Sequence, residues 1–240
     1  MQIEGKNAVY ELLNSNLTIE KISVLDKTTD VKLREIINQA RDKGIKIEFV
    51  PKTNLDKNSQ TGHHQGVIAL ATEFVYSDLE DVVSKNKNGN LFFIILDNVM
   101  DPHNLGSVLR VADCAGVTAV IIPKNRSAVV NETVIRTSAG ATAFVPVCKV
   151  TNLASAIKYL KDNGVWVYAA DMNGKDMSEV NLKGNVAIVI GNEGSGISEL
   201  IRKESDEIIS IPMFGKINSL NASVSAGILA YEVVKQNKKG

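Results

Sequence analysis

Hydrophobic residues form short continuous runs along this chain, and the runs alternate with stretches in which apolar positions recur at helical spacing. Such runs are typical of strands buried on both faces, and the helical spacing is typical of helices with one buried face. Gly44 is expected to end a helix, and the region after Asn54 is rich in turn-forming residues. Before residue 73 the pattern predicts helices at 7–13 and 31–43 and strands at 22–25, 45–50 and 66–72.

The alternation resumes at residue 91 and continues almost to the end of the chain. The polar segment 73–90 separates the two regions and is predicted to be a linker with at most one helical turn. After it, the pattern predicts strands at 91–96, 117–122, 144–147, 165–170, 185–190 and 207–212, and helices at 106–115, 131–139, 153–162, shortly after 196, and at 219–236.

These elements predict an α/β protein with two domains, a small α/β domain over residues 1–72 and a larger one over residues 91–240. The regular alternation of strand and helix in the larger domain favours a mostly parallel sheet with helices on both faces. In open sheets of this type, ligands bind beyond the carboxyl ends of the strands. The loops that follow the strands of the larger domain are therefore the candidate site.

The composition is ordinary for a globular protein and excludes a simple charge-based function. Of the 240 residues, 44% are hydrophobic and 22% are charged, and 27 basic residues balance 27 acidic ones. A surface that binds nucleic acid must therefore arise from the arrangement of charges in space. Lys235, Lys238 and Lys239, near the C-terminus, are expected to be a solvated helix end.

The two cysteines and the first residues bear on location. Cys114 and Cys148 lie among apolar or small residues and are predicted to be buried thiols in a reducing cytoplasm. The N-terminal residues lack the basic and apolar regions of a secretion signal, and no apolar run reaches the length of a membrane span. We therefore expect a cytoplasmic protein that does not associate with a membrane.

Polar, glycine-containing loops follow three strands of the larger domain. The run LFFIIL leads into DNVMDPHNLGSVLRVADCAG, NVAIVI leads into GNEGSGISEL, and IISIPM leads into FGKINSLNASVSAGILAYE. Because the carboxyl ends of parallel strands meet at one edge of a sheet, we expect these loops to converge.

The middle loop does not have the features of a phosphate-binding site. Gly196 is followed by Ile197 and not by lysine, which excludes a Walker A loop, and the spacing around Gly194 does not match the dinucleotide fingerprint. Glu193 would also repel a polyphosphate. The loop therefore favours close approach of main-chain atoms to a neutral or cationic ligand.

The other two loops contain polar residues at or near helix starts. Asn104 is a candidate N-cap, and Arg110 lies further along the same predicted helix. Ser219 is a second candidate cap, and Asn221 and Ser225 lie one turn apart. Taken singly, these features are more simply explained as a turn, a surface cation and a helix cap. Their joint occurrence after three strands indicates a functional site.

Three stretches, NLGSVLR, IVIGNEGSGIS and SLNASVSAGI, resemble the three motifs of the SpoU (TrmH-type) class of SPOUT RNA ribose methyltransferases. IEGKNAVYELL and HHQGVIA resemble the small ribosomal-protein-like RNA-binding domain that precedes the catalytic domain in this family. The resemblance covers the whole chain and is greatest to the bacterial subgroup that 2′-O-methylates a guanosine of 23S rRNA. It implies an RNA substrate, S-adenosyl-L-methionine as methyl donor, a homodimer and a trefoil knot near the C-terminus, and it implies no metal.

The resemblance also implies which residues bind the cofactor. Gly191 would meet the cofactor at the end of its strand, and Ile211 and Leu220 would contact the adenosine largely through backbone groups. Gly140 and Ala141, in the stretch TSAGA, are further candidates for the lining of this pocket.

Catalysis is assigned by the same resemblance to five polar residues. Arg110 matches the family's catalytic arginine. Because a guanidinium stays protonated in proteins, we expect it to hold a substrate phosphate and stabilise the developing oxyanion, and not to act as a base. Asn104 and Glu193 would orient Arg110 and the ribose, while Ser219 and Asn221 would complete the polar wall.

Three alternatives remain open at this point. An enzyme of the same class acting on tRNA is the first, and the N-terminal domain favours rRNA over it. A non-catalytic RNA-binding or ribosome-assembly factor is the second, and the presence of Arg110 and Glu193 argues against it. An unrelated nucleotide-binding enzyme is the third, and the glycine loop disfavours it. The neighbouring His63 and His64 are expected to contact RNA or to form a structural turn, because adjacent side chains on an extended segment point apart and suit a shared metal poorly.

Overall fold

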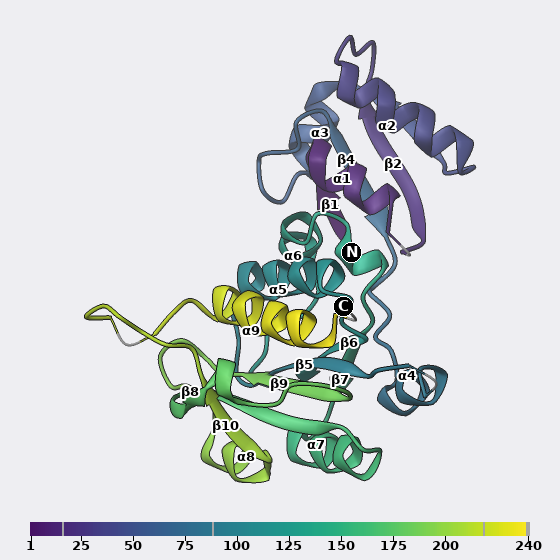
Figure 1. Ribbon diagram of the computed structural model, residues 1–240. Helices are drawn as coiled ribbons and strands as arrows, with labels where there is room; N and C mark the ends of the chain where they lie inside the picture. Colours follow the sequence, from purple (N-terminus) through teal and green to yellow (C-terminus); the bar gives the residue numbers. More distant parts are fainter. Residues whose placement is uncertain (16, 88, 218, 239–240) are drawn as a thin grey trace. The chain divides into compact units, whose positions relative to one another are not determined.

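The computed structural model describes residues 1–15, 17–87, 89–217 and 219–238, and the chain divides into two compact units. The first unit consists of Met1–Val75 and Val130–Phe144, and the second consists of Tyr76–Val129 and Val145–Gly240. Figure 1 shows both units and labels most of their helices and strands.

The first unit contains a four-stranded mixed sheet with the strand order β1-β4-β2-β3. Strands β2 and β3 are parallel, whereas β4 is antiparallel to both of its neighbours. The elements of this unit are the strands β1 Gln2–Glu4, β2 Ile19–Leu25, β3 Ile47–Val50 and β4 Val67–Ala71, the helices α1 Lys6–Leu13, α2 Val31–Asp42, α3 Lys52–Asn58 and α6 Glu132–Thr137, and the 3-10 turn η1 Ala141–Ala143.

Helix α2 shows how local sequence sets the ends of an element. Asp30 precedes it, and its Oδ1 accepts a hydrogen bond from the backbone N–H of Leu33 at 3.1 Å. Gly44 follows the C-cap with φ 67°, a left-handed conformation that glycine adopts without strain. The helix predicted from residue 31 and ended by Gly44 is confirmed. Helix α3, by contrast, lies where turns were predicted, because Leu55 is its one buried residue and a single apolar position shows no period.

Glu4, at the end of β1, is a buried carboxylate that holds the segment after α3. Its Oε1 accepts hydrogen bonds from the side-chain amide of Gln2 at 2.7 Å and from the backbone N–H of Gln60 at 2.6 Å. Its Oε2 accepts from the hydroxyls of Ser59 and Thr61. Burial disfavours the charged form, but these hydrogen bonds outweigh burial and lower the pKa of Glu4 to about 2.

The second unit contains a six-stranded sheet with the order β10-β8-β9-β5-β6-β7, and every neighbouring pair in it is parallel. The predicted α/β fold with a mostly parallel sheet is therefore confirmed. The strands are β5 Phe92–Leu96, β6 Ala119–Pro123, β7 Val147–Val150, β8 Trp166–Asp176, β9 Val186–Ile190 and β10 Glu207–Ser210.

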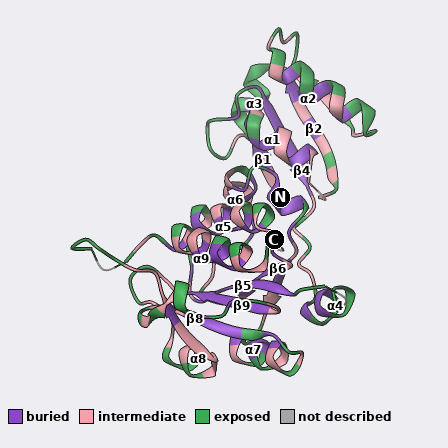
Figure 2. Ribbon diagram, in the orientation of Figure 1, coloured by how far each residue is buried: buried purple, intermediate pink, exposed green. Residues whose placement is uncertain are grey.

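Helices cover both faces of this sheet, as predicted. Figure 1 shows α5 and α9 side by side on one face, with α7 and α8 on the other. The central strands β5 and β9 are buried (Figure 2), and the core includes Phe93, Ile95, Ile121, Val167 and Val189. The helices of this unit are α4 Leu79–Lys85, α5 Pro102–Cys114, α7 Leu153–Asp162, α8 Glu199–Glu204 and α9 Ala222–Asn237, with the 3-10 turn η2 at Met177–Glu179.

The segment 73–90, predicted to be a linker, contains helix α4. Leu79, Val82 and Val83 of this helix are buried in the core of the second unit. Asp78 caps the helix by accepting hydrogen bonds from the backbone N–H groups of its first turn. The helix was not predicted because its three apolar positions lie among charged and polar residues and form too short a pattern.

The segment 130–144 groups with the first unit, although its place in the sequence predicted that it belongs to the larger domain. Helix α6 contacts α1 and β1, and Glu132 accepts a hydrogen bond from the backbone N–H of Glu4 at 3.0 Å. The strand predicted at 144–147 is also displaced. Strand β7 begins only at Val147, because residues 141–143 form η1.

The two cysteines differ in environment. Cys148, in β7, is buried, and burial with the nearby charge of Asp78 raises the pKa of its thiol to about 12. Cys114 is exposed, so its predicted burial is wrong. It ends α5 outside the buried stripe of that helix, which includes Leu105, Leu109 and Ala112. Among the described residues, no helix combines the length and apolar content that crossing a membrane requires.

Candidate active site

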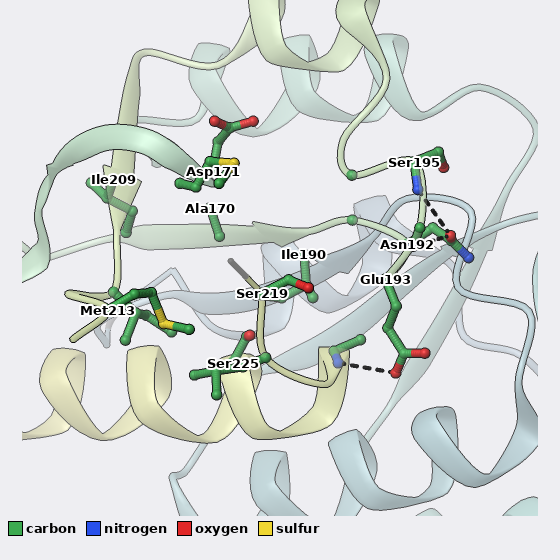
Figure 3. Close-up of a pocket in the computed structure, with 17 residues that line it drawn as sticks. Ala170, Asp171, Ile190, Asn192, Glu193, Ser195, Ile209, Met213, Ser219 and Ser225 are labelled. Atoms are coloured by element: carbon green, nitrogen blue, oxygen red, sulfur yellow. Dashed lines mark hydrogen bonds between the residues drawn. The ribbon is translucent and has the colours of Figure 1, made fainter. Parts of the chain in front are cut away.

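A pocket of about 400 Å³ lies at the carboxyl ends of the strands in the second unit. Its size falls in the range typical of small-molecule sites. Figure 3 shows residues from four segments around it. The lining residues are Ala170–Met172 of β8, residues 190–196 at and after the end of β9, Ile209, Ile211 and Met213 in and after β10, and Ser219, Leu220, Ala222 and Ser225 at the start of α9.

The glycine loop, residues 191–198, folds tightly on itself beside this pocket. Asn192 and Gly196 exchange two backbone hydrogen bonds, at 2.8 and 3.1 Å. The side-chain oxygen of Asn192 accepts from the backbone N–H of Gly194 at 2.8 Å. A Cβ atom on Gly191 would lie 2.3 Å from the carbonyl carbon of Gly196, so no larger residue fits there without opening the loop. The tight shape of the loop therefore depends on glycine at position 191 and on the side chain of Asn192.

Glu193 emerges from the glycine loop and forms a cluster with Asn104 and Asn221, which we name the amide–carboxylate cluster. Glu193 Oε1 accepts from the side-chain amide of Asn104 at 2.9 Å and from that of Asn221. The same amide of Asn221 donates to Asn104 Oδ1 at 2.9 Å. The three loops that were expected to converge thus meet through these three side chains.

The start of α9 also stabilises the Glu193 carboxylate. Figure 3 shows the Glu193 side chain reaching the first turn of α9, where Oε1 accepts from the backbone N–H of Ala222 at 3.3 Å. The first N–H groups of a helix have no acceptor within the helix and carry partial positive charge. A carboxylate is therefore favourable in this place, and the cluster does not need a lysine or arginine to balance it.

Two predicted helix caps are wrong. Asn104 lies inside α5, and the cap is Asp101, whose Oδ1 accepts from the backbone N–H of His103 at 2.8 Å. Pro102 occupies the first helical position, which fixes the start of the helix earlier than predicted. At α9 the cap is Asn221 and not Ser219, because Asn221 Oδ1 accepts from the backbone N–H groups of Ser223 and Val224. Asn221 therefore serves both the helix and the cluster.

The structure brings most of the sequence-predicted site residues together. Gly191, Glu193, Ile211, Ser219 and Leu220 all line the pocket. Asn104 and Asn221 do not line it, but both bond directly to Glu193.

Three predicted site residues lie elsewhere. Arg110 is on an exposed face of α5, does not line the pocket, and makes no hydrogen bond or ion pair with another described residue. The expectation that Asn104 and Glu193 orient Arg110 is therefore not met, because the two side chains bond to each other and to Asn221. Gly140 and Ala141 do not line the pocket either, and they belong to the segment that groups with the first unit.

The charge of the pocket suits a cation. Two carboxylates, Asp171 and Glu193, are among its lining residues, and none of the lining residues is a lysine or arginine. Asp171 forms an ion pair with Arg202 at 3.3 Å, and its other oxygen accepts from the backbone N–H of Asn173 at 2.9 Å. This lining agrees with the prediction from sequence that the loop does not bind a polyphosphate.

Sequence reasoning missed several contributors to the pocket, among them Asn192 and the segment Ala170–Met172. Asn192 was not singled out, although asparagine commonly bonds to backbone N–H groups two residues later in turns. Ala170–Met172 were missed because β8 continues to Asp176, beyond the apolar run that predicted it. The loops that lie beside this end of β8 are set by the strand order of the sheet, in which β8 lies between β10 and β9, and the sequence pattern does not show that order.

His64 has a structural role. It is 6% exposed, its Nδ1 accepts from the backbone N–H of Gly66 at 3.0 Å, and its Nε2 lies 2.8 Å from Asp56 Oδ1. Since Nδ1 accepts, the ring proton is on Nε2 and is donated to Asp56. The structural-turn interpretation therefore holds for His64, while His63 is exposed.

Comparison with known families matches two parts of the chain. Residues 91–231 match the SpoU rRNA methylase family, and residues 2–77 match the family described as RNA 2′-O ribose methyltransferase substrate binding. YacO of Bacillus subtilis strain 168, named as a TrmH family tRNA/rRNA methyltransferase, is 41% identical over 97% of this chain and 94% of its own length. A protein of Staphylococcus aureus strain COL with the same family name is 44% identical over 98% of this chain and 95% of its own length.

Solved structures share the fold. The SpoU methyltransferase AviRb of Streptomyces viridochromogenes, solved in complex with AdoMet, has a TM-score of 0.82 at 20% identity and covers 98% of this chain and 89% of its own. A structure described as an RNA 2′-O ribose methyltransferase has a TM-score of 0.75 at 25% identity, over 98% of this chain and 88% of its own. The TrmH/SpoU tRNA modifying enzyme of A. aeolicus has a TM-score of 0.56 at 29% identity, but covers only 66% of this chain and 83% of its own.

Proposed function

The chain belongs to the SpoU rRNA methylase family, and we propose that it transfers a methyl group from S-adenosyl-L-methionine to a ribose 2′-oxygen of RNA. One feature of the second unit supports this proposal most directly. An acidic pocket without a basic lining residue lies at the carboxyl ends of parallel strands, and the three family motifs meet beside it through Glu193, Asn104 and Asn221.

The pocket fits the proposed cofactor chemically. Gly191, Ile211 and Leu220 would hold the cofactor, largely through backbone atoms, and the carboxylate of Glu193, which has no ion-pair partner among the described residues, favours a cationic ligand. S-adenosyl-L-methionine, when bound, supplies a methyl carbon attached to a positively charged sulfur. Gly140 and Ala141 remain candidates for contact with the cofactor, although they do not line this pocket.

The polar residues of the chain would act on the ribose. Attack by a 2′-hydroxyl requires removal of its proton or stabilisation of the developing alkoxide. We assign that stabilisation to Arg110, which would also hold a substrate phosphate. Asn104, Asn221 and Glu193 would keep the wall of the site in place, because each is already hydrogen-bonded to the others, and Ser219 would add a hydroxyl to that wall.

For the substrate we propose 23S rRNA, with a guanosine ribose as the methylated position. The match of residues 2–77 to the substrate-binding family supports a role for the first unit in selecting RNA. The A. aeolicus tRNA modifying enzyme matches only part of this chain, which favours rRNA over tRNA for a chain with the additional unit. A tRNA substrate of the same chemistry is the alternative. This RNA substrate would place the activity in the cytoplasm.

We propose a homodimer, with the two second units in contact. Large apolar side chains on α9 and in the loop before it are exposed, which is unusual for the surface of a monomer. They include Phe214 at 98%, Ile217 at 75% and Tyr231 at 53%. A C-terminal knot is proposed on family grounds.

The test is methylation of unmodified RNA. The protein would be incubated with methyl-labelled S-adenosyl-L-methionine together with rRNA transcripts in one reaction and with tRNA transcripts in another. The labelled nucleoside would be identified after digestion of each RNA. We expect label on a ribose of 23S rRNA. Label on a base would refute the proposed chemistry, label on tRNA alone would refute the proposed substrate, and no label on any RNA would favour the non-catalytic factor.

A further inference from the structure

Asp97 is a buried carboxylate that the proposed mechanism does not use. It is the first residue after β5, is 4% exposed, and has no ion-pair partner among the described residues. A carboxylate in such surroundings is costly unless hydrogen bonds satisfy it. The groups that satisfy it therefore indicate its role.

The hydrogen bonds of Asp97 connect both ends of the glycine loop to the end of β5. Asp97 Oδ2 accepts from the backbone N–H of Ser198, the last residue of the loop, at 2.7 Å. The backbone N–H of Asp97 donates to the carbonyl of Ile190, directly before the loop, at 2.8 Å. One residue thus contacts the chain on both sides of Glu193, within the second unit.

A second connection runs through Asn98. Its side-chain amide donates to Asp97 Oδ1 at 2.9 Å, and its backbone has φ 59°, a left-handed conformation that asparagine tolerates better than most residues. In this conformation the carbonyl of Asn98 accepts from the side-chain amide of Asn192 at 3.1 Å. Asn192 in turn holds the backbone N–H of Gly194. Asp97 therefore also supports the interior of the loop.

We propose that Asp97 is a positioning residue for methyl transfer, which places Glu193 against Asn104 and Asn221 by holding the glycine loop at both ends. The inference rests on the proposed function, since the loop lines the proposed cofactor pocket. Asp97 itself does not line the pocket, so its influence on cofactor and rate is transmitted through the loop.

Two substitutions at this position separate the hydrogen bonds from the charge. Asp97→Ala removes both side-chain acceptors. Asp97→Asn keeps an oxygen for Ser198 and an amide that can pair with Asn98 once the Asn98 amide turns over. We expect Asp97→Ala to lower kcat/KM by about 100-fold or more, because a shift of Glu193 relative to Asn104 and Asn221 would misplace groups of the site. We expect kcat/KM of Asp97→Asn to stay within about 10-fold of that of the unmodified chain.

Asp206→Ala is the matched control. Asp206 is also a poorly exposed carboxylate that accepts from a backbone N–H, that of Val167 at 2.8 Å. It precedes β10 and so lies at the amino ends of the strands, away from the pocket. We expect it to lower the melting temperature without changing kcat/KM more than about 3-fold, which is within the usual effect of a remote substitution.

Two readouts do not require turnover. In cofactor-free protein, we expect amide hydrogen exchange at residues 193–198 to accelerate in Asp97→Ala but not in Asp206→Ala. We also expect the Kd of S-adenosylhomocysteine to rise at least about 10-fold in Asp97→Ala alone. If Asp97→Ala does not fold, Ser198→Pro removes the same hydrogen bond, because proline has no backbone N–H to donate to Asp97. Proline fits at this position because Ser198 has φ −61°, which proline adopts.

Unchanged exchange in the loop, or kcat/KM and Kd in the Asp97→Ala or Ser198→Pro protein that match the Asp206→Ala control, would overturn the role of Asp97. An unmodified chain that methylates no RNA would refute the proposed function instead. The exchange comparison would still decide whether Asp97 holds the loop.

Discussion

Glu193 accepts three hydrogen bonds, from two different segments, through a single oxygen. Its Oε1 accepts from Asn104 on α5, from Asn221 at the cap of α9 and from the backbone of Ala222. Each donor is an amide, so the cluster joins one negative charge with neutral groups and a helix start. Replacing a neutral amide with an acid at this point should therefore be more disruptive than removing it.

The Asn104→Asp substitution tests this charge arrangement. It changes a donor to Glu193 into a second carboxylate at hydrogen-bond distance, and two carboxylates in contact cannot both stay ionised without large repulsion. We expect methyl transfer at pH 8 to fall at least about 100-fold, with partial recovery toward pH 5.5 as the pair takes up one proton.

The measurement is the single-turnover rate across that pH range, with Asn104→Ala as the comparison. Asn104→Ala loses the hydrogen bonds without adding charge, so its rate should not recover at low pH. If the single-turnover rate of Asn104→Asp recovers no more at low pH than that of Asn104→Ala, the proposed repulsion between carboxylates at positions 104 and 193 is contradicted.

At the scale of elements, two short segments outside the helices and strands keep their shape through side-chain hydrogen bonds and close backbone contacts. The glycine loop is closed by Asn192 and by the close approach of Gly191 to Gly196. The segment after α3 is held by Glu4, which bonds to Ser59, Gln60 and Thr61. Both segments should respond strongly to a single substitution.

Gly191→Ala should destabilise the cofactor-free protein. The added Cβ would overlap the backbone of Gly196 and Ile197, whose atoms lie at 2.3 and 2.4 Å. Overpacking of this kind costs about 1–3 kcal/mol, or roughly 2–10 °C in melting temperature for a chain of this size. Gly194→Ala is the control, since its Cβ would meet only the Asn192 side chain, at 3.4 Å, and thermal unfolding should change little. Equal melting temperatures for the two variants would contradict the described loop.

Glu4→Gln should alter stability in acid. The folded-state pKa of Glu4 is lowered to about 2 from 4.5, so its contribution is present above pH 4.5 and is lost as pH falls toward 2. A difference of this size corresponds to about 3 kcal/mol at neutral pH. Urea unfolding between pH 2 and 7 should show a lower stability for Glu4→Gln at pH 7 and a smaller loss on acidification.

Glu20→Gln serves as the control for that experiment. Glu20 is exposed, and its side chain has no hydrogen-bond or ion-pair partner among the described residues. Its substitution should leave the pH profile of the unmodified chain in place. A Glu4→Gln profile that runs parallel to that of the control would show that Glu4 does not hold its segment.

At the scale of the whole molecule, the position of Arg110 matters most. It lies on an exposed face of α5 and does not line the pocket of its own chain. In the proposed homodimer, the Arg110 of one protomer is free to serve the pocket of the other.

Mixing two inactive variants tests this sharing. Arg110→Ala and Glu193→Gln would each be purified, mixed in equal amounts, unfolded and refolded together. If Arg110 acts across the interface, half of the dimers are mixed and each has one intact site, so about a quarter of the unmodified activity should return. If Arg110 acts within its own chain, the mixture should stay as inactive as its components, and the proposed sharing would be refuted.

The sequence predicted most of the second unit because its strands are buried on both faces and its helices have clear apolar stripes. Helix α7 was predicted with the bounds observed, and β5 and β9 differ from their predictions by one residue. The failures have local causes. Helices α3 and α4 have few apolar positions among polar ones, and α5 starts earlier than expected because Asp101 and Pro102 set its N-terminus.

The sequence by itself determined the alternation of strand and helix, the three polar loops and the exclusion of a phosphate site, since these follow from the order of residue types along the chain. Only the tertiary structure decided that Glu193 bonds to Asn104 and Asn221, that Arg110 lies away from the pocket, and that residues 130–144 group with the first unit. Hydrogen bonds between residues 28 to 117 positions apart depend on strand order and register, and no local pattern encodes those.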